Sequence, residues 1–245
     1  AIDVTTTIPR SVGLAGSSAI VIALLRALQR HAGLPPLPPD ELASLALSVE
    51  VDELGYAAGL QDRVVQAYGR PMAMRFGPAH TRDVAGLTAG TYEELTDPLP
   101  GWLTVAARST ESEPSQTVHR SLRERHDDGD PQVVAAMADL AAAALEAADA
   151  IVAGDAPGLG RAMDRTFDIR RSIVDIRPGQ REMIDVARRA GAFANFAGSG
   201  GAVSVLALDE ATSRSVSAGL RAIGCEIIDA RAPGDRHTPS LQSAW

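Results

Sequence analysis

Residues Pro9–Ala19 read Pro-Arg-Ser-Val-Gly-Leu-Ala-Gly-Ser-Ser-Ala, and an apolar segment follows them without a break. Gly13 and Gly16 permit positive φ angles and let backbone amides approach a bound group with no Cβ in the way. Ser17 and Ser18 stand where the next helix begins, so their hydroxyls join unpaired amides at the positive end of the helix dipole. This pattern predicts a phosphate-binding loop; an ordinary strand–turn–helix with a serine cap is the alternative. It is not a Walker A loop, because no Gly-Lys-Ser/Thr follows.

The composition of the 245 residues restricts the class of protein and of partner. Hydrophobic residues make up 45% and charged residues 22%, which is typical of a globular chain. The net charge of −8 argues against a nucleic-acid-binding surface, so a polyanion site has to be built locally from amides, a few arginines or a metal. The single cysteine, Cys225, and the lack of a secretory signal or a membrane-length apolar run predict a cytoplasmic protein with no membrane partner.

Apolar periodicity and chain breakers predict an α+β fold, with a helical bundle in the middle and βαβ-like units at both ends. Helices are expected after the phosphate loop to about His31, from the N-cap Asp40, and over residues 131–152, 157–174, 178–190 and 211–223. The expected strands are Ala1–Ile8, Met72–Phe76, Trp102–Arg108, Phe193–Ala197, Ala202–Leu208 and Glu226–Ala230. A loop without periodicity is expected at Ser109–Thr117.

Two carboxylates, Glu50 and Asp62, are candidates for a pair that acts together in catalysis. Glu50 closes an amphipathic helix, and Asp62 follows twelve positions later beyond a glycine-containing turn. In phosphoryl transfer one carboxylate can hold Mg²⁺ while another takes the proton of the attacking hydroxyl. Arg63, beside Asp62, would keep that carboxylate ionised. The alternative is a solvated helix end followed by a surface Asp62–Arg63 ion pair.

A second glycine-rich loop, Gly198–Gly201, joins two apolar strands. Its three glycines and one serine exceed the needs of a tight turn, which indicates that a ligand or another backbone comes close. A plain hairpin connection is the alternative. Arg170 and Arg171 lie in a predicted helix and point about 100° apart, so only one of them can readily face a site.

These elements, in this order, resemble the GHMP kinase superfamily of small-molecule kinases over nearly the whole chain. Pro9–Ala19 is similar to the family motif P-x-x-x-G-L-G-S-S-A, with Ala15 in place of a usual glycine, and Ala197–Ala202 is similar to its C-terminal glycine motif. Within the superfamily, the chain resembles the glucuronokinases. The stretches that carry this resemblance are Ile8–Arg10, Glu53–Gly55, Ala58–Val64, Phe167–Arg171 and Gly198–Val203.

The resemblance implies a two-part α+β fold. Residues 1–108 would form the N-terminal, ATP- and Mg²⁺-binding domain, ribosomal S5-like and lacking its first strands, and residues 109–245 a ferredoxin-like C-terminal domain. The family fold normally begins with a segment that carries a substrate-binding motif and part of the adenine pocket, and nothing in this sequence corresponds to it. We therefore expect that segment to be supplied by the full-length chain or by another polypeptide.

The resemblance also implies roles for the candidate residues. ATP phosphates would bind the first loop, at Pro9, Gly13, Leu14, Ala15, Gly16, Ser17, Ser18 and Ala19. Glu50 would hold Mg²⁺ together with Ser17 or Ser18, and Asp62 would be the catalytic base with Arg63 beside it. The expected substrate-binding residues are Asp62, Arg170, Arg171, Gly198, Ser199, Gly200 and Gly201.

The activity implied is ATP-dependent phosphorylation of a sugar hydroxyl, namely the anomeric hydroxyl of glucuronate or a related sugar, which gives a sugar 1-phosphate. Two alternatives stay open: a kinase of the same fold with a different acceptor, and a non-catalytic nucleotide-binding module derived from such a kinase.

Overall fold

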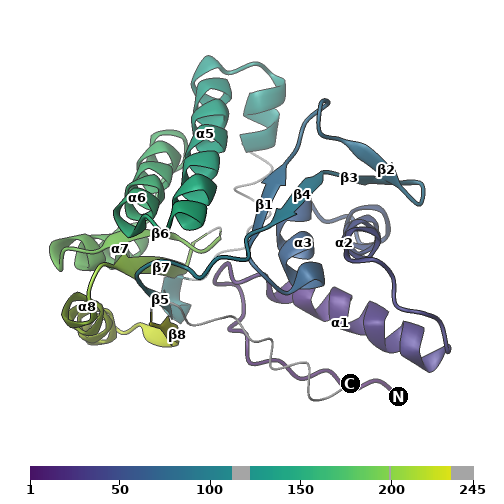
Figure 1. The fold of residues 1–245 in the computed structure, drawn as a ribbon, viewed down its shortest axis with the longest axis horizontal. Coiled ribbons are helices and arrows are strands. Elements are labelled where there is room, and N and C mark those ends of the chain that lie inside the picture. The colour runs from purple at the N-terminus through teal and green to yellow at the C-terminus, as the bar shows by residue number, and fades with distance from the viewer. Residues whose placement is uncertain (112–121, 199, 233–245) are drawn as a thin grey trace. The chain divides into compact units, whose positions relative to one another are not determined.

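The structure is a computed structural model that describes residues 1–111, 122–198 and 200–232, and it divides into two compact units (Figure 1). The described part of the first unit consists of Ala1–Ile8 and Ala15–Thr96. The second unit consists of Pro9–Leu14 and the described residues from Asp97 onward. Helices and strands occur in both units, which confirms the α+β class.

The first unit is built on helices whose apolar faces meet. They are α1 (Gly16–His31), α2 (Pro39–Ser48), a π-helical turn η1 (Val49–Glu53) and α3 (Leu60–Tyr68). Their shared core consists of Ile22, Leu42, Ala43, Ala46, Leu60, Val64 and Ala67. Two antiparallel strand pairs follow, β1 (Met72–Arg75) with β4 (Thr91–Glu94) and β2 (Arg82–Val84) with β3 (Leu87–Ala89).

Two sequence predictions for this unit are wrong. Ala1–Ile8 is not a strand, because no described strand pairs with it and an extended segment needs a neighbour for its backbone hydrogen bonds. Asp40 is not the N-cap of α2; Pro38 holds that position and Asp40 lies in the first turn, where its carboxylate bonds Arg82 instead. Pro39, at the first helical position, suits the helix start, since its missing N–H would be unpaired there in any case.

The second unit contains one antiparallel sheet of four strands in the order β6-β7-β5-β8. The strands are β5 (Trp102–Ala107), β6 (Phe193–Phe196), β7 (Ala202–Ala207) and β8 (Glu226–Arg231). Helices separate β5 from β6 and β7 from β8, which gives the β-α-β-β-α-β order of a ferredoxin-like fold. This confirms the architecture expected for the C-terminal part.

The helices of this unit are α5 (Pro131–Ala153), α6 (Ala156–Ile173), α7 (Pro178–Arg189) and α8 (Glu210–Ala222), and residues 122–127 are also helical. Aspartates cap α5, α6 and α8 by accepting first-turn amide hydrogens. Phe167, Met183 and Leu220, from α6, α7 and α8, pack with strand residues such as Val203 and Val205 in one core. This core fixes the ends of β6 and β7, where the second glycine loop begins and ends.

The contacts of the chain divide it at Thr96/Asp97, whereas the predicted boundary between family domains lies at residue 108. The observed division falls before β5 because this strand pairs on one side with β7 and on the other with β8, so it belongs to the sheet of the second unit. The placement of the family's two domains at 1–108 and 109–245 stays a prediction. Ser109–Glu111, at the start of the expected loop, forms a single 3₁₀ turn, and the later part of that loop lies outside the described residues.

Candidate active site

The two glycine-rich segments meet within the second unit. Val12 is 1% exposed and packs with Ala107 and Ala202, at the ends of β5 and β7. The next residue, Gly13, lies against Gly198: a Cβ on Gly198 would come 2.9 Å from the carbonyl carbon of Gly13 and closer still to its oxygen. The glycines of the second loop thus allow another backbone to approach, as the sequence analysis inferred.

Two further glycines of the second loop adopt conformations that side chains rarely allow. Gly200 has φ +131° and lies against the side chain of Gln180, and Gly201 has φ +85° and packs on Val12. Ser199, the remaining member of the predicted loop site, lies outside the described residues.

Residues at the start of α7 hold a third segment beside this loop. Arg177 donates a hydrogen bond to the carbonyl oxygen of Glu111, and buried Gln180 donates a longer one, 3.5 Å, to the same oxygen. Neither Arg177 nor Gln180 is among the predicted site residues, because nothing in the local sequence distinguishes them from other polar helix residues.

The start of α1, in the first unit, has the features of an anion site. Ala15 is the N-cap in the left-handed conformation, with φ 55° and ψ 32°, and no side chain caps the first-turn amides. These amides point outward at the positive end of the helix, where an anion can accept their hydrogen bonds. A non-glycine residue held in this region costs of order 1–3 kcal/mol, and such strain is often found at ligand sites.

The two serines of this turn have different surroundings. The hydroxyl of Ser18 is buried and donates a hydrogen bond of 2.9 Å to the carbonyl oxygen of Ala15. Ser17 is exposed. A ligand from solvent therefore reaches the Ser17 hydroxyl directly, whereas Ser18 supports the strained turn.

Glu50 and Arg63 form a buried ion pair in the first unit. Glu50 is 1% and Arg63 5% exposed, and Oε2 of Glu50 lies 2.6 Å from Nε and 2.5 Å from Nη2 of Arg63. Arg63 also donates a hydrogen bond to the carbonyl oxygen of Gly59, at the N-cap of α3. A carboxylate that loses water on folding needs such a partner, since an unpaired buried charge is strongly destabilising.

Asp62, the predicted base, remains accessible. Its side chain is 56% exposed, and Oδ2 lies 3.7 Å from Nη1 of Arg63. Arg63 thus contacts both carboxylates of the predicted pair, with the shorter contacts going to Glu50. The pairing that the sequence suggested, Asp62 with Arg63, exists but is the looser of the two.

Hard oxygen donors suited to Mg²⁺ are present in this unit, namely the carboxylate of Glu50 and the serine hydroxyls of the α1 turn. Both contacts between Arg63 and Glu50 go to Oε2 of Glu50, so Oε1 stands outside the ion pair. No three His, Cys, Asp or Glu side chains gather as a metal site in the part of the chain that the structure describes. The residues therefore fit an ion that takes its remaining ligands from water and substrate phosphates, as Mg²⁺ commonly does.

Arg170 and Arg171 point to different environments, as their helical spacing requires. The Arg170 guanidinium lies over the ring of Phe196, 5.5 Å from its centroid, and burial lowers the pKa of Arg170. The Arg171 side chain is 61% exposed and lies 3.8 Å from the carboxylate of Asp168. Arg170 is thus the arginine beside the second glycine loop.

Comparison with known proteins identifies the family. The profile of the GHMP kinases N terminal domain matches residues 1–70, and that of the GHMP kinases C terminal matches residues 144–224. The chain belongs to the GHMP kinase family. The GHMP kinase motifs named from the sequence lie within or next to these two matched regions.

Two curated GHMP kinase relatives are similar over most of the chain. Probable glucuronokinase 2 of Arabidopsis thaliana is 39% identical over 205 residues, and Glucuronokinase 1 of the same plant is 38% identical over 204 residues. Each match covers 82% of this chain and 55% of the relative. The chain thus spans about half the length of the curated relatives that it matches.

Solved structures support the GHMP kinase fold. A mevalonate kinase of L. major is similar with a TM-score of 0.65 and 21% identity, over 89% of this chain and 64% of that one. A phosphomevalonate kinase of Streptococcus pneumoniae gives 0.72 and 12%, over 88% and 67% of the two chains. At these identities the likeness concerns the fold alone, and it confirms the predicted two-part fold class.

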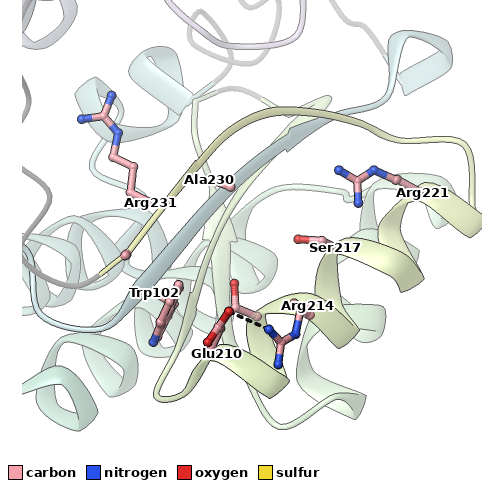
Figure 2. Close-up of a pocket in the computed structure, with 9 residues that line it drawn as sticks. Trp102, Glu210, Arg214, Ser217, Arg221, Ala230 and Arg231 are labelled. Atoms are coloured by element: carbon pink, nitrogen blue, oxygen red, sulfur yellow. Dashed lines mark hydrogen bonds and ion pairs between the residues drawn. The ribbon is translucent and has the colours of Figure 1, made fainter.

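A separate cavity of about 440 Å³ lies between α8 and the strands β5 and β8 (Figure 2). Glu210 and Arg214 form an ion pair of 2.6 Å at its edge, and Ser217, Arg221 and Trp102 also line it. None of the predicted site residues is among its lining residues.

Across the described residues, no helix is long and apolar enough to cross a membrane.

Proposed function

We propose that this GHMP kinase transfers the terminal phosphoryl group of ATP to the anomeric hydroxyl of glucuronate or a closely related uronic acid. The identity to two plant glucuronokinases supports the acceptor class. The observation that supports the chemistry is that two carboxylates of the first unit have different surroundings. Glu50 is buried against Arg63, whereas Asp62, on the first turn of α3, is exposed and open to a substrate hydroxyl.

In this proposal the uncapped amides of the α1 turn, with the Ser17 hydroxyl, bind the ATP phosphates. Oε1 of Glu50 and a serine hydroxyl, Ser17 or Ser18, are the protein groups that would hold Mg²⁺. When bound, the ion neutralises phosphate charge. Arg63 fixes Glu50 in position, because its Nε and Nη2 both contact Oε2.

Asp62 accepts the proton of the attacking hydroxyl while the hydroxyl oxygen bonds to the γ-phosphorus, the bond from that phosphorus to the bridging oxygen breaks, and ADP leaves. The side chain of Asp62 is 56% exposed, so a substrate hydroxyl can reach the carboxylate, and Nη1 of Arg63 lies 3.7 Å from Oδ2. General-base catalysis by a positioned carboxylate contributes about 10²–10⁴-fold in rate.

The test is turnover of Mg²⁺-ATP by the purified protein with glucuronate, with mass spectrometry to identify the sugar 1-phosphate. We expect Asp62→Asn to reduce kcat by about 10²-fold or more while calorimetry finds ATP binding unchanged. Asp52→Asn is the matched control, since Asp52 is also an exposed acid of the first unit. Unchanged turnover in Asp62→Asn would refute the base assignment.

Two other outcomes distinguish the alternatives. Turnover with a different hydroxyl acceptor, found by screening sugars, sugar phosphates and isoprenoid alcohols, would keep the kinase and replace its substrate. Binding of Mg²⁺-ATP with no turnover on any acceptor would favour a non-catalytic nucleotide-binding module.

A further inference from the structure

Two adjacent arginines on α6 differ in a way that points to a ligand. Arg171 is largely exposed and has Asp168 as its partner, which is usual for a surface arginine. Arg170 is partly buried, and its guanidinium lies over the ring of Phe196. The side chain of Arg170 is therefore held in one place, away from bulk solvent.

No carboxylate within residues 1–111, 122–198 and 200–232 pairs with Arg170. The nearest acids along α6, Asp164 and Asp168, are each bound by Arg188 of α7, at 3.1 Å from Nε and from Nη1 respectively. Because these acids are already neutralised by another arginine, the charge of Arg170 has no counterpart among the described residues.

Burial without an ionic partner is unfavourable for a cation, and it lowers the pKa of Arg170. The Phe196 ring offsets part of this cost, since the face of an aromatic ring attracts a cation. An anion that docks on the guanidinium would supply the missing compensation. Unlike an exposed arginine, Arg170 has already lost part of its hydration before the anion arrives.

The position of Arg170 connects it to the second glycine loop. Phe196 ends β6, and its ring is fixed from the side by Phe167, with centroids 5.4 Å apart and planes at 74°. Two residues beyond Phe196, Gly198 packs against Gly13 of the first loop. The guanidinium thus stands at the base of the loop that lets a ligand or backbone approach.

We propose that Arg170 binds the carboxylate of the acceptor and so selects a sugar acid over a neutral sugar. This inference rests on the proposed function, and it names the residue that recognises the substrate class. The planar guanidinium can donate two parallel hydrogen bonds to a carboxylate, a geometry that lysine lacks. A neutral sugar with a hydroxymethyl group would leave the half-buried charge uncompensated, so it binds less well.

The test compares Arg170→Met with Arg161→Met, which removes an exposed guanidinium of the same helix. Glucuronate binding is measured by calorimetry, and KM is measured for glucuronate, glucose and ATP. Because hydrogen bonds to charged groups are worth about 1.5–3 kcal/mol, we expect Arg170→Met to weaken glucuronate binding and raise its KM by about 10–100-fold. We expect the KM values of Arg170→Met for ATP and glucose to stay within about twofold of the wild type, and Arg161→Met to resemble the wild type.

Arg170→Lys keeps the charge, so it should fold if Arg170→Met does not, and its glucuronate KM should lie between those of Met and wild type. Thermal unfolding reports on folding in each variant. If the wild type binds glucuronate without phosphorylating it, the proposed function fails and the binding data alone test Arg170. Unchanged glucuronate affinity in Arg170→Met and Arg170→Lys overturns the inference, as does a selective rise in the KM for ATP. A wild type that neither binds nor phosphorylates glucuronate overturns both proposals.

Discussion

The contact between the two glycine segments makes a sharp prediction for Gly198→Ala. An alanine Cβ would lie 2.9 Å from the carbonyl carbon of Gly13, 3.0 Å from its Cα and closer to its oxygen, whereas carbon atoms normally meet at about 3.5–4.0 Å. Both sides of the contact are backbone, so no side chain can rotate away. The segments must separate by roughly 1 Å, and overpacking of this kind costs about 1–3 kcal/mol.

A loss of about 1–3 kcal/mol should lower the thermal midpoint by roughly 2–12 °C, measured by calorimetry. Since a displacement of about 1 Å at a positioned site can cost 10²-fold, kcat/KM of the phosphotransfer should fall by at least tenfold. Gly191→Ala is the control: Gly191 has φ +84° but nothing within 4 Å of a Cβ, so only the backbone strain of about 1–2 kcal/mol applies. A Gly198→Ala protein with wild-type stability and activity would refute the packing of these loops.

Three further predictions concern single groups. Arg63→Met should destabilise the fold by about 3–5 kcal/mol in urea unfolding, because it leaves the buried charge of Glu50 unpaired. Adding Glu50→Gln to this variant should restore part of the lost stability. Equal stability of the wild type and Arg63→Met would contradict the ion pair. Ser18→Ala should cost about 1 kcal/mol of stability through its lost hydrogen bond, whereas Ser17→Ala should instead weaken ATP binding in calorimetry; the reverse pattern would exchange their roles. Burial raises the pKa of the Cys225 thiol, so less thiolate is present at any given pH. Iodoacetamide should therefore alkylate Cys225 far more slowly in the native protein than in urea at pH 8, as mass spectrometry would measure. Equal alkylation rates in the two conditions would contradict the burial of the thiol.

Much of the second unit follows from local sequence signals. The predicted helix over residues 131–152 is observed at Pro131–Ala153, and the strands predicted at Phe193–Ala197 and Ala202–Leu208 are observed within a residue of those ends. Asp130, Asp155 and Asp209 accept amide hydrogens at helix starts, and glycines such as Gly191 follow helix ends. These signals act over a few residues, so a sequence reveals them directly.

Segments that depend on a distant partner were less predictable. Ala1–Ile8 has the composition of a strand, but strand formation requires a neighbour to pair with. The short strands β2, β3 and β4 were not predicted, because three or four residues carry too little periodicity to indicate a strand.

The prediction of a phosphate-binding loop at Pro9–Ala19 needs no tertiary structure, because glycines and serines at a helix start act through their own backbone. Glu50, Asp62 and the second glycine loop are candidates on sequence grounds as well. The folded chain adds that Arg63 bonds Glu50 more closely than Asp62, and that Gly13 touches Gly198. Such partners are set by the packing of helices and strands far apart in the chain, and residue spacing alone does not specify which side chain will be buried against which.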